Sequence, residues 1–293
     1  MSTDGSGDPA PRHLPGHIAA ALAGAGGAAD SAGRPWAGRS LAGDDAKIHN
    51  FEDDDGAADA GYLAAVDRLR KGSGDEAAVV RALATARVFI PIVAQLAEEA
   101  DGGHGLQSDK QADMALVTLK APDGRTAMPA FTSAAALAAW HPDARPVAVY
   151  AARAALSAVA EGAELMVLDP GSPLTFVVRR PAVWALAQQH EWVPSYADPS
   201  LAPEMAQAAA VVPAVRSIEL LPGGGVASRT ADGAVLAGGG PGPELQVVLY
   251  LEEGLDAGAV QHLVASLQGE WSRNVLFGER VDSMEIKLRR AVS

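Results

Sequence analysis

Apolar side chains recur at helical and strand spacing from about residue 50 onward, and this pattern predicts a series of short elements. Tyr62 and Leu69 lie two turns apart on one face of a first expected helix. Asp75 precedes a second amphipathic stretch and is expected to cap its helix. Residues 87–93 have the composition of a strand. Because proline cannot donate a backbone hydrogen bond, Pro91 predicts that this strand either lies at a sheet edge or contains a bulge.

A turn sequence divides the next two expected strands. Residues 121–124 read Ala-Pro-Asp-Gly, in which proline presets the turn and glycine accepts a positive φ. Segments 114–120 and 125–131 are therefore expected to form a β-hairpin. Further strands of this part of the chain are expected at 147–150, 165–168 and 175–178. A helix is expected between the first two, and the turn Asp169-Pro170-Gly171 between the last two.

The pattern after residue 198 is weaker but still predicts regular elements. Strands are expected at 215–221 and 244–251, and Asp256 is expected to cap a long helix. Residues 281–290 alternate apolar and charged side chains, which is typical of a half-buried strand and compatible with a position at a sheet edge. The glycine-rich segment 222–243 is expected to form a loop.

Together these elements predict a mixed α/β, or α+β, protein of two domains, each with a small sheet packed against helices. We expect the first domain, including its leading helices, at residues 41–198 and the second at residues 199–293. Residues 1–40 are rich in Ala, Gly, Pro and Ser and lack periodic large apolar positions. Such a segment cannot bury enough surface to offset its ordering entropy, so we expect a disordered tail.

Composition and charge narrow the possible functions. The chain has 23 basic and 36 acidic residues, a net charge of −13, which disfavours nucleic acid and anionic membrane surfaces as partners. Cysteine is absent, so disulfides, thiolate metal sites and thiol nucleophiles are excluded. No apolar run approaches the roughly 20 residues of a membrane span, and the first residues do not resemble a signal peptide. A cytoplasmic location is expected.

Several segments resemble, in the right order, the bacterial SseB family, named for enhanced serine sensitivity. They read ADMALVTL, PDGR, PAFTS, LAAW, RPV and RPAVWALAQ, followed near the C-terminus by ELQVVLYLEEGLD and ERVDSMEIKL. The resemblance begins at about Asn50 and implies an SseB N-terminal domain followed by a C-terminal one. It brings no catalytic residues that could be carried over to this chain.

Candidate binding residues lie at two expected turns. Phe131, Thr132 and Ser133 join a strand to a helix, where backbone N–H groups could receive a carboxylate or phosphate. The simpler interpretation is a helix N-cap with Phe131 in the core. Asp169 and Gly171 belong to the second turn, where the carboxylate is expected to bond its own backbone rather than act as a base.

Aromatic and acidic residues provide further candidates for a binding surface. Trp140, Trp184 and Trp192 could anchor a partner if they are exposed, since tryptophan is favoured at interface centres. The acidic run around residues 53–55 could bind a partner in a salt-sensitive way. Histidines are scattered and no metal or cofactor motif is present, so neither a metal nor a cofactor is expected.

These observations favour a non-enzymatic protein that binds another protein or a small ligand. The oligomeric state stays open. An alternative is an enzyme, either a hydrolase or a small-molecule-modifying protein, that uses Ser133, Asp169 or a histidine in one shared cleft. A third alternative, a regulator linked to an amino acid, is suggested only by the name of the family.

Overall fold

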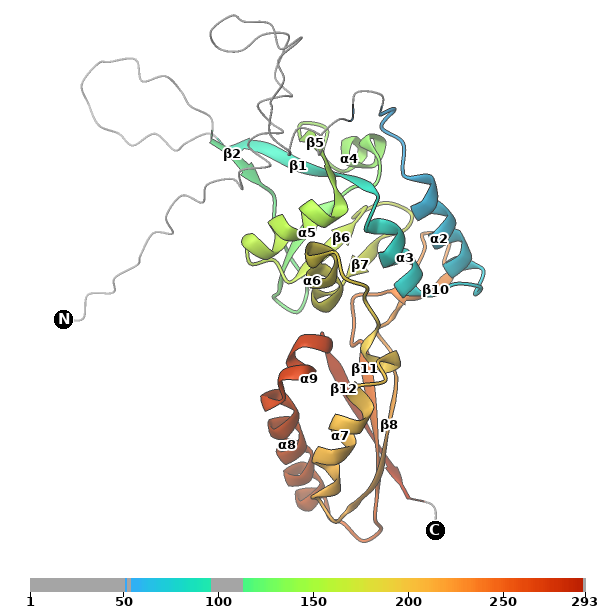
Figure 1. The fold of residues 1–293 in the computed structure, drawn as a ribbon, viewed down its shortest axis with the longest axis vertical. Coiled ribbons are helices and arrows are strands. Elements are labelled where there is room, and N and C mark those ends of the chain that lie inside the picture. The colour runs from blue at the N-terminus through green and yellow to red at the C-terminus, as the bar shows by residue number, and fades with distance from the viewer. Residues whose placement is uncertain (1–50, 52–53, 96–112, 292–293) are drawn as a thin grey trace, which may run out of the picture.

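The computed structural model describes Phe51, residues 54–95 and residues 113–291. It confirms a mixed α/β fold in which several small sheets pack against helices (Figure 1). Two bodies, each with its own apolar core, stack along the long axis. We call the body built mainly from residues 54–192 the first unit, and the body built mainly from residues 201–291 the second unit. The tail expected at residues 1–40 lies outside the described residues.

The first unit forms where the sequence supplies helix caps and short apolar runs. Asp75 and Ser133 accept hydrogen bonds from the first turns of their helices, as the sequence predicts. The helices are α2 (Ala60–Arg70), α3 (Glu76–Leu83), α4 (Ala134–Trp140), α5 (Ala151–Ala160) and α6 (Arg180–Gln188). The strands are β1 (Arg87–Gln95), β2 (Asp113–Leu116), β3 (Leu119–Lys120), β4 (Thr126–Ala130), β5 (Arg145–Tyr150), β6 (Leu165–Leu168) and β7 (Phe176–Val178).

These strands divide into two sheets, whereas the sequence pattern predicts one. The first sheet has the order β2-β1-β5, and the second has the order β3-β4-β6-β7. Phe89 and Phe131 exchange backbone hydrogen bonds of 2.7 and 2.8 Å, which join the two sheets at one point. The expected hairpin exists only as β3 and β4, because β2 pairs with β1 instead. Strands β4 and β6 are parallel, so their carboxyl ends meet at one edge.

The edge position predicted for Pro91 is wrong, because β1 is the central strand of its sheet. On one side Pro91 lies opposite Pro146 of β5. On the other side the register with β2 begins only at Ile92, so β2 does not extend over Pro91. A central strand therefore accommodates the proline just beyond the end of its neighbour.

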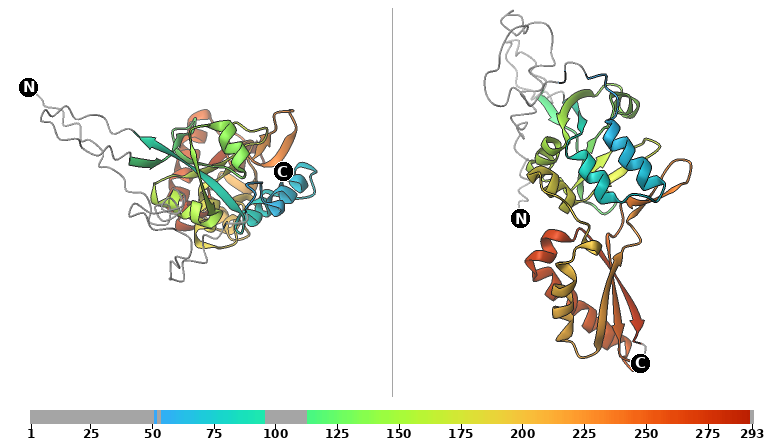
Figure 2. Two further views of the ribbon diagram at one scale, coloured as in Figure 1. Left: turned by 90° about the horizontal axis from the view of Figure 1, so that it is seen from above. Right: turned by 45° about the vertical axis from the view of Figure 1, so that its right-hand side comes forward.

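The second unit is a three-stranded sheet covered on one face by helices (Figure 2). Its central strand contributes buried leucine and valine side chains to a core closed by Trp271. The edge strand predicted near residues 281–290 is confirmed, and it runs parallel to the central strand. The elements are α7 (Leu201–Ala210), β8 (Val215–Pro222), β11 (Leu245–Leu251), α8 (Ala257–Arg273), α9 (Val275–Arg280) and β12 (Met284–Arg290), preceded by the short 3₁₀ helix η2 (Ser195–Ala197).

The glycine-rich segment expected to be a loop contains two paired strands, β9 (Ala227–Arg229) and β10 (Val235–Gly239). This hairpin leaves the second unit and packs against α2, α3 and β7 of the first unit. Leu236 is fully buried in the first core. At Gly239, φ is +69° and an added Cβ would lie 2.2 Å from the ring of Phe176. The glycines therefore permit close packing between the units.

Candidate functional site

The structure brings the candidate residues of both predicted turns together at the carboxyl ends of β4 and β6. Thr132 follows β4, Asp169 follows β6, and the Asp169 carboxylate accepts from the Thr132 amide at 2.8 Å and from its hydroxyl at 2.7 Å. The prediction that Asp169 bonds its own turn is therefore wrong. With φ at +48°, Asp169 lies beside a parallel strand end that supplies both donors.

The other candidate residues near these turns have structural roles, because they either pack against neighbouring side chains or cap a helix. Ser133 Oγ accepts from the Ala136 amide at 3.1 Å and caps α4, while Phe131 is fully buried. Trp140 packs against Phe131 with ring centroids 5.2 Å apart. Gly171 has φ of +78°, and a Cβ there would lie 3.7 Å from the Trp140 ring. Each of these groups therefore has a structural partner.

Burial raises the pKa of the Asp169 carboxyl, while its hydrogen bonds from Thr132 act in the opposite direction. The same carboxylate faces the buried Tyr62, whose pKa is raised by burial and by that negative charge. Beneath the turn, the Arg87 guanidinium donates to the Thr132 carbonyl at 2.8 Å. Ser133 and Asp169 are thus neighbours, but the oxygens of Asp169 are directed at Thr132 and not at the Ser133 hydroxyl.

The described part of the acidic run is partly occupied by internal contacts. Asp54 forms a two-point ion pair with Arg87, at 2.5 and 2.6 Å. Asp55 accepts from the amide of Ala57 at 2.8 Å. Asp53 lies outside the described residues. Within those residues, no group of three or more acidic or histidine side chains is arranged to hold a metal ion.

A cleft of about 490 Å³ lies between α6 of the first unit and α9 of the second. Arg180, Trp184 and Gln188 are spaced by four residues and share the side of α6 that lines the cleft. Trp184 is 49% exposed, whereas Trp140 is partly buried and Trp192 almost completely buried. Of the three tryptophans that the sequence suggested as anchors, Trp184 is thus the one available to a partner.

The cleft also contains a guanidinium that has few internal partners. Arg280 forms the wall opposite α6, and its contact with Asp198 is long, at 3.9 Å. Trp192 contributes to the lining, but its indole N–H is itself buried and has no hydrogen-bond partner among the described residues. The exposed Trp184 ring and a guanidinium therefore flank one hollow of the size of a small-ligand site.

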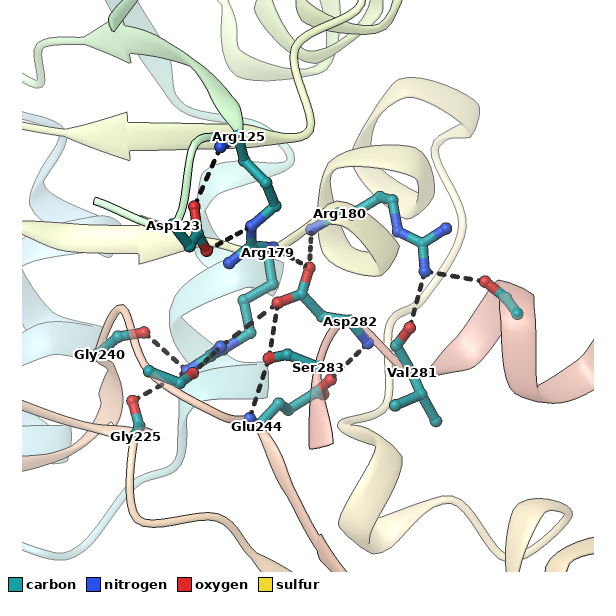
Figure 3. A network of polar contacts seen from close by, with 12 residues as sticks. Asp123, Arg125, Arg179, Arg180, Gly225, Gly240, Glu244, Val281, Asp282 and Ser283 are labelled. Carbon is teal, nitrogen blue, oxygen red and sulfur yellow. Dashed lines mark hydrogen bonds and ion pairs between the residues drawn. The ribbon is translucent and has the colours of Figure 1, made fainter. Parts of the chain in front are cut away.

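A buried polar network joins the two units beside this cleft (Figure 3). At its centre the Arg179 guanidinium donates to the carbonyls of Gly242, Gly225 and Gly240 at 2.7, 3.0 and 2.6 Å. It also lies 3.5 Å from the Asp282 carboxylate. Arg179 therefore connects the start of α6 to the glycine-rich segment and to the strand end of the second unit. We call this network the junction.

Asp282 receives further contacts from the first unit. Arg125, in the turn between β3 and β4, donates to its carboxylate at 2.8 Å. The backbone amide of Arg180 approaches the same carboxylate at 3.4 Å, and the guanidinium of Arg180 donates to the Gly278 and Val281 carbonyls. Asp282 directly follows the α9 segment, so these contacts position the α9 wall of the cleft.

Two further buried acids complete the junction. Glu244 accepts from the amides of Ser195 and Asp282, at 3.1 and 3.0 Å. Glu76 accepts from the Tyr196 hydroxyl at 2.9 Å and from the Gly239 amide at 3.1 Å. Burial raises the pKa of both carboxyls, and their hydrogen bonds only partly oppose it.

The sequence analysis did not predict the junction, although the sequence contains one signal of it. Two consecutive arginines, Arg179 and Arg180, follow a fully apolar strand and precede Pro181 at a helix start. A charged side chain between two buried elements calls for a buried partner. The partners of Arg179 are glycine carbonyls 46 to 63 residues away, which no local pattern reveals.

Comparison with known families gives one match. Residues 63–185 match the family model described as SseB protein N-terminal domain. The matched segment runs from α2 into α6, so it includes both sheets of the first unit and Trp184. No curated protein matches the chain, and no solved structure matches it. Among the described residues, no helix is both long and apolar enough to cross a membrane.

Proposed function

Residues 63–185 belong to the SseB family as its N-terminal domain, and from this premise we propose that the protein is a cytoplasmic binding module. It binds another protein or a small ligand in the cleft between α6 and α9, with Trp184 as the anchor. The exposure of Trp184 in this cleft is the observation that carries the proposal. A large aromatic side chain left half in water gains free energy when a partner covers it.

The helix that presents Trp184 is held firmly. Ala182, Val183 and Leu186, on the other side of α6, are buried in the first core. A rigid wall loses little conformational entropy on binding, which favours affinity. The opposite wall belongs to the second unit, so a bound partner would contact both units at once.

The groups at the two turns are occupied by internal hydrogen bonds, which disfavours catalysis at this position. The Thr132 donors and the Asp169 oxygens are bonded to each other, and Ser133 caps a helix. A reaction at this position would have to break these contacts before Ser133 could act as a nucleophile. The Trp184 cleft needs no such rearrangement to receive a partner.

The test is to capture companions of the tagged protein from its native cell at low salt and to identify both proteins and metabolites. Trp184→Ala should reduce the recovered companion by about 30-fold, the effect of losing roughly 2 kcal/mol at an interface anchor. Leu156→Ala is the matched control, because Leu156 is 42% exposed on α5 and does not line the cleft. Equal recovery with both variants, or no companion with the wild type, would refute the proposal.

A further inference from the structure

The junction contains more buried acids than buried bases. The carboxylates of Glu76, Glu244 and Asp282 are almost completely removed from solvent. Two guanidinium groups, those of Arg125 and Arg179, contact a carboxylate of this set, and both contact Asp282. Neither Glu76 nor Glu244 forms an ion pair with a residue that the structure describes. Full ionisation would thus leave one negative charge in excess in a dry region, which is costly.

The charged groups that face the two glutamates all belong to the junction or lie next to it. Glu76 faces Arg179 across the junction, Tyr196 of η2, and Asp75 on its own helix. Glu244 faces Arg179, Asp282 and the Tyr196 hydroxyl. Arg179 thus attracts both glutamates, while Asp75 and Asp282 repel them. Its guanidinium is already directed at three carbonyls and Asp282, so it does not neutralise a second acid.

The hydrogen bonds of Glu76 tie the first unit to the second. Glu76 lies on α3, and its partner Tyr196 packs against the core of the second unit. Its other partner, the amide of Gly239, belongs to the hairpin that crosses between the units. Glu244 directly precedes β11 and accepts hydrogen bonds from the amides of Ser195 and Asp282. A change in charge at either glutamate therefore acts where the units meet.

We propose that the junction is a proton-dependent latch, in which one proton, on Glu76 or on Glu244, offsets the excess buried charge and holds the two units together. When that proton is lost to solvent, the buried charge favours entry of water. The three-stranded sheet and helices of the second unit then move away from the first unit, while the β9–β10 hairpin stays in the first core. The carboxyls bind the proton more tightly in the closed junction than in water. The junction is therefore fully stable below their ordinary pKa of 4.5 and loses stability as pH rises through their raised pKa.

The latch regulates the cleft of the proposed function, and to that extent the inference rests on that function. Residues 278–280 form the α9 wall of the cleft, and Val281 and Asp282 follow directly. Asp282 donates its amide to Glu244 and receives Arg125 and Arg179. Opening of the junction would move this wall away from Trp184. A partner that needs both walls would then bind better at lower pH.

The test measures the distance between the units without any ligand. The natural chain contains no cysteine, so Leu63→Cys on α2 and Val211→Cys after α7 provide two unique, exposed positions for spin labels. We expect a single narrow distance distribution near pH 4.5. The ratio of separated to closed molecules should rise about tenfold per pH unit above that, until the raised pKa is passed.

Glu76→Gln removes the excess charge and keeps both hydrogen bonds, because the amide N–H can donate to the Tyr196 oxygen while the amide oxygen accepts from Gly239. The distance distribution of this variant should not change with pH. The matched control is Glu219→Gln, which alters a solvent-exposed glutamate bonded to the hydroxyl of Tyr250 and should leave the wild-type pH dependence intact.

Glu244→Gln provides a second variant in case Glu76→Gln does not fold. It also removes the excess charge but loses one accepted hydrogen bond, so it should be less stable and equally insensitive to pH. A wild-type distance that is constant across this pH range would overturn the latch, as would a Glu76→Gln distance that still varies. Because no ligand is present, failure of Trp184→Ala to affect capture would remove the proposed function and leave this result standing.

Discussion

Replacement of Arg179 by methionine should destabilise the whole protein. The Arg179 side chain is 1% exposed, and its guanidinium is the donor to three glycine carbonyls and a neighbour of the Asp282 carboxylate. Methionine keeps most of the apolar stem but provides no donor. The substitution therefore removes the polar centre of the junction without creating a large cavity.

The size of the effect follows from the groups left behind. Each buried carbonyl that loses its donor costs about 1 to 3 kcal/mol, and a buried ion pair broken on one side costs about 3 to 5 kcal/mol. Arg125 still contacts Asp282, which reduces the second cost. Over the three carbonyls the first cost is about 3 to 9 kcal/mol, so we expect a loss of at least about 3 kcal/mol, a large part of the roughly 5 to 15 kcal/mol that stabilises a typical domain.

Urea denaturation followed by circular dichroism measures this loss directly. Arg273→Met serves as the control, because Arg273 also donates to a carbonyl, that of Gly269, but is 71% exposed. Its effect should stay within about 0.5 kcal/mol. A loss below about 1 kcal/mol for Arg179→Met would refute the reasoning, because it would mean that water can replace the guanidinium and that the junction is not dry.

Two further predictions concern crowding and pH. Gly239→Ala should lower the free energy of unfolding by about 3 kcal/mol or more in thermal unfolding, because the new Cβ would lie 2.2 Å from Phe176. Gly233→Ala is the control, because Gly233 also has a positive φ but nothing lies within 4 Å of an added Cβ, and it should cost about 1 kcal/mol. Equal losses would contradict the close packing. The hydrogen bond from Arg87 lowers the pKa of Asp54 below 3.8, so this pair stabilises the fold above that value and stops doing so as pH falls through the lowered pKa. Asp54→Asn should therefore be less stable than the wild type at about pH 7, and the difference should shrink as the pH falls below 3.8; a constant gap in denaturation midpoints would count against the ion pair.

Local signals in the sequence predict the local features of this fold well. Asp75, Ser133 and Asp256 cap helices as expected, because a side-chain oxygen before a helical run has few other roles. Pro181 lies in the first turn of α6, where its missing N–H has no cost. The alternating charges of β12 predict a strand that lies at a sheet edge. In each case the information lies within a few residues.

Long-range pairing could not be predicted in the same way. The split into two sheets depends on Phe89 meeting Phe131, and the pairing of β1 with β2 spans residues that carry no register signal. The candidate turns at Thr132 and Asp169 were identified separately, but their mutual hydrogen bonds follow from the parallel pairing of β4 with β6. Such contacts depend on topology rather than on local preference.

The glycine-rich segment shows how composition can mislead. Glycine is typical of loops, so β9 and β10 gave no strand signal. In the structure an added Cβ at Gly225 would lie 2.0 Å from the backbone of Gly242, which means that two chain segments are in direct contact. Glycine is required here because no side chain fits between them, and only the folded chain reveals this.

The path of the β9–β10 hairpin makes the protein difficult to divide. The chain passes from the second unit into the first core at Leu236 and then returns to begin β11. A fragment that stops before residue 199 would lose this leucine and the carbonyls that receive Arg179. The complementary fragment would carry a hairpin whose apolar side has nothing to cover it. Neither half could therefore be exchanged between proteins as an independent part, and insertion or loss of the hairpin would affect both halves together.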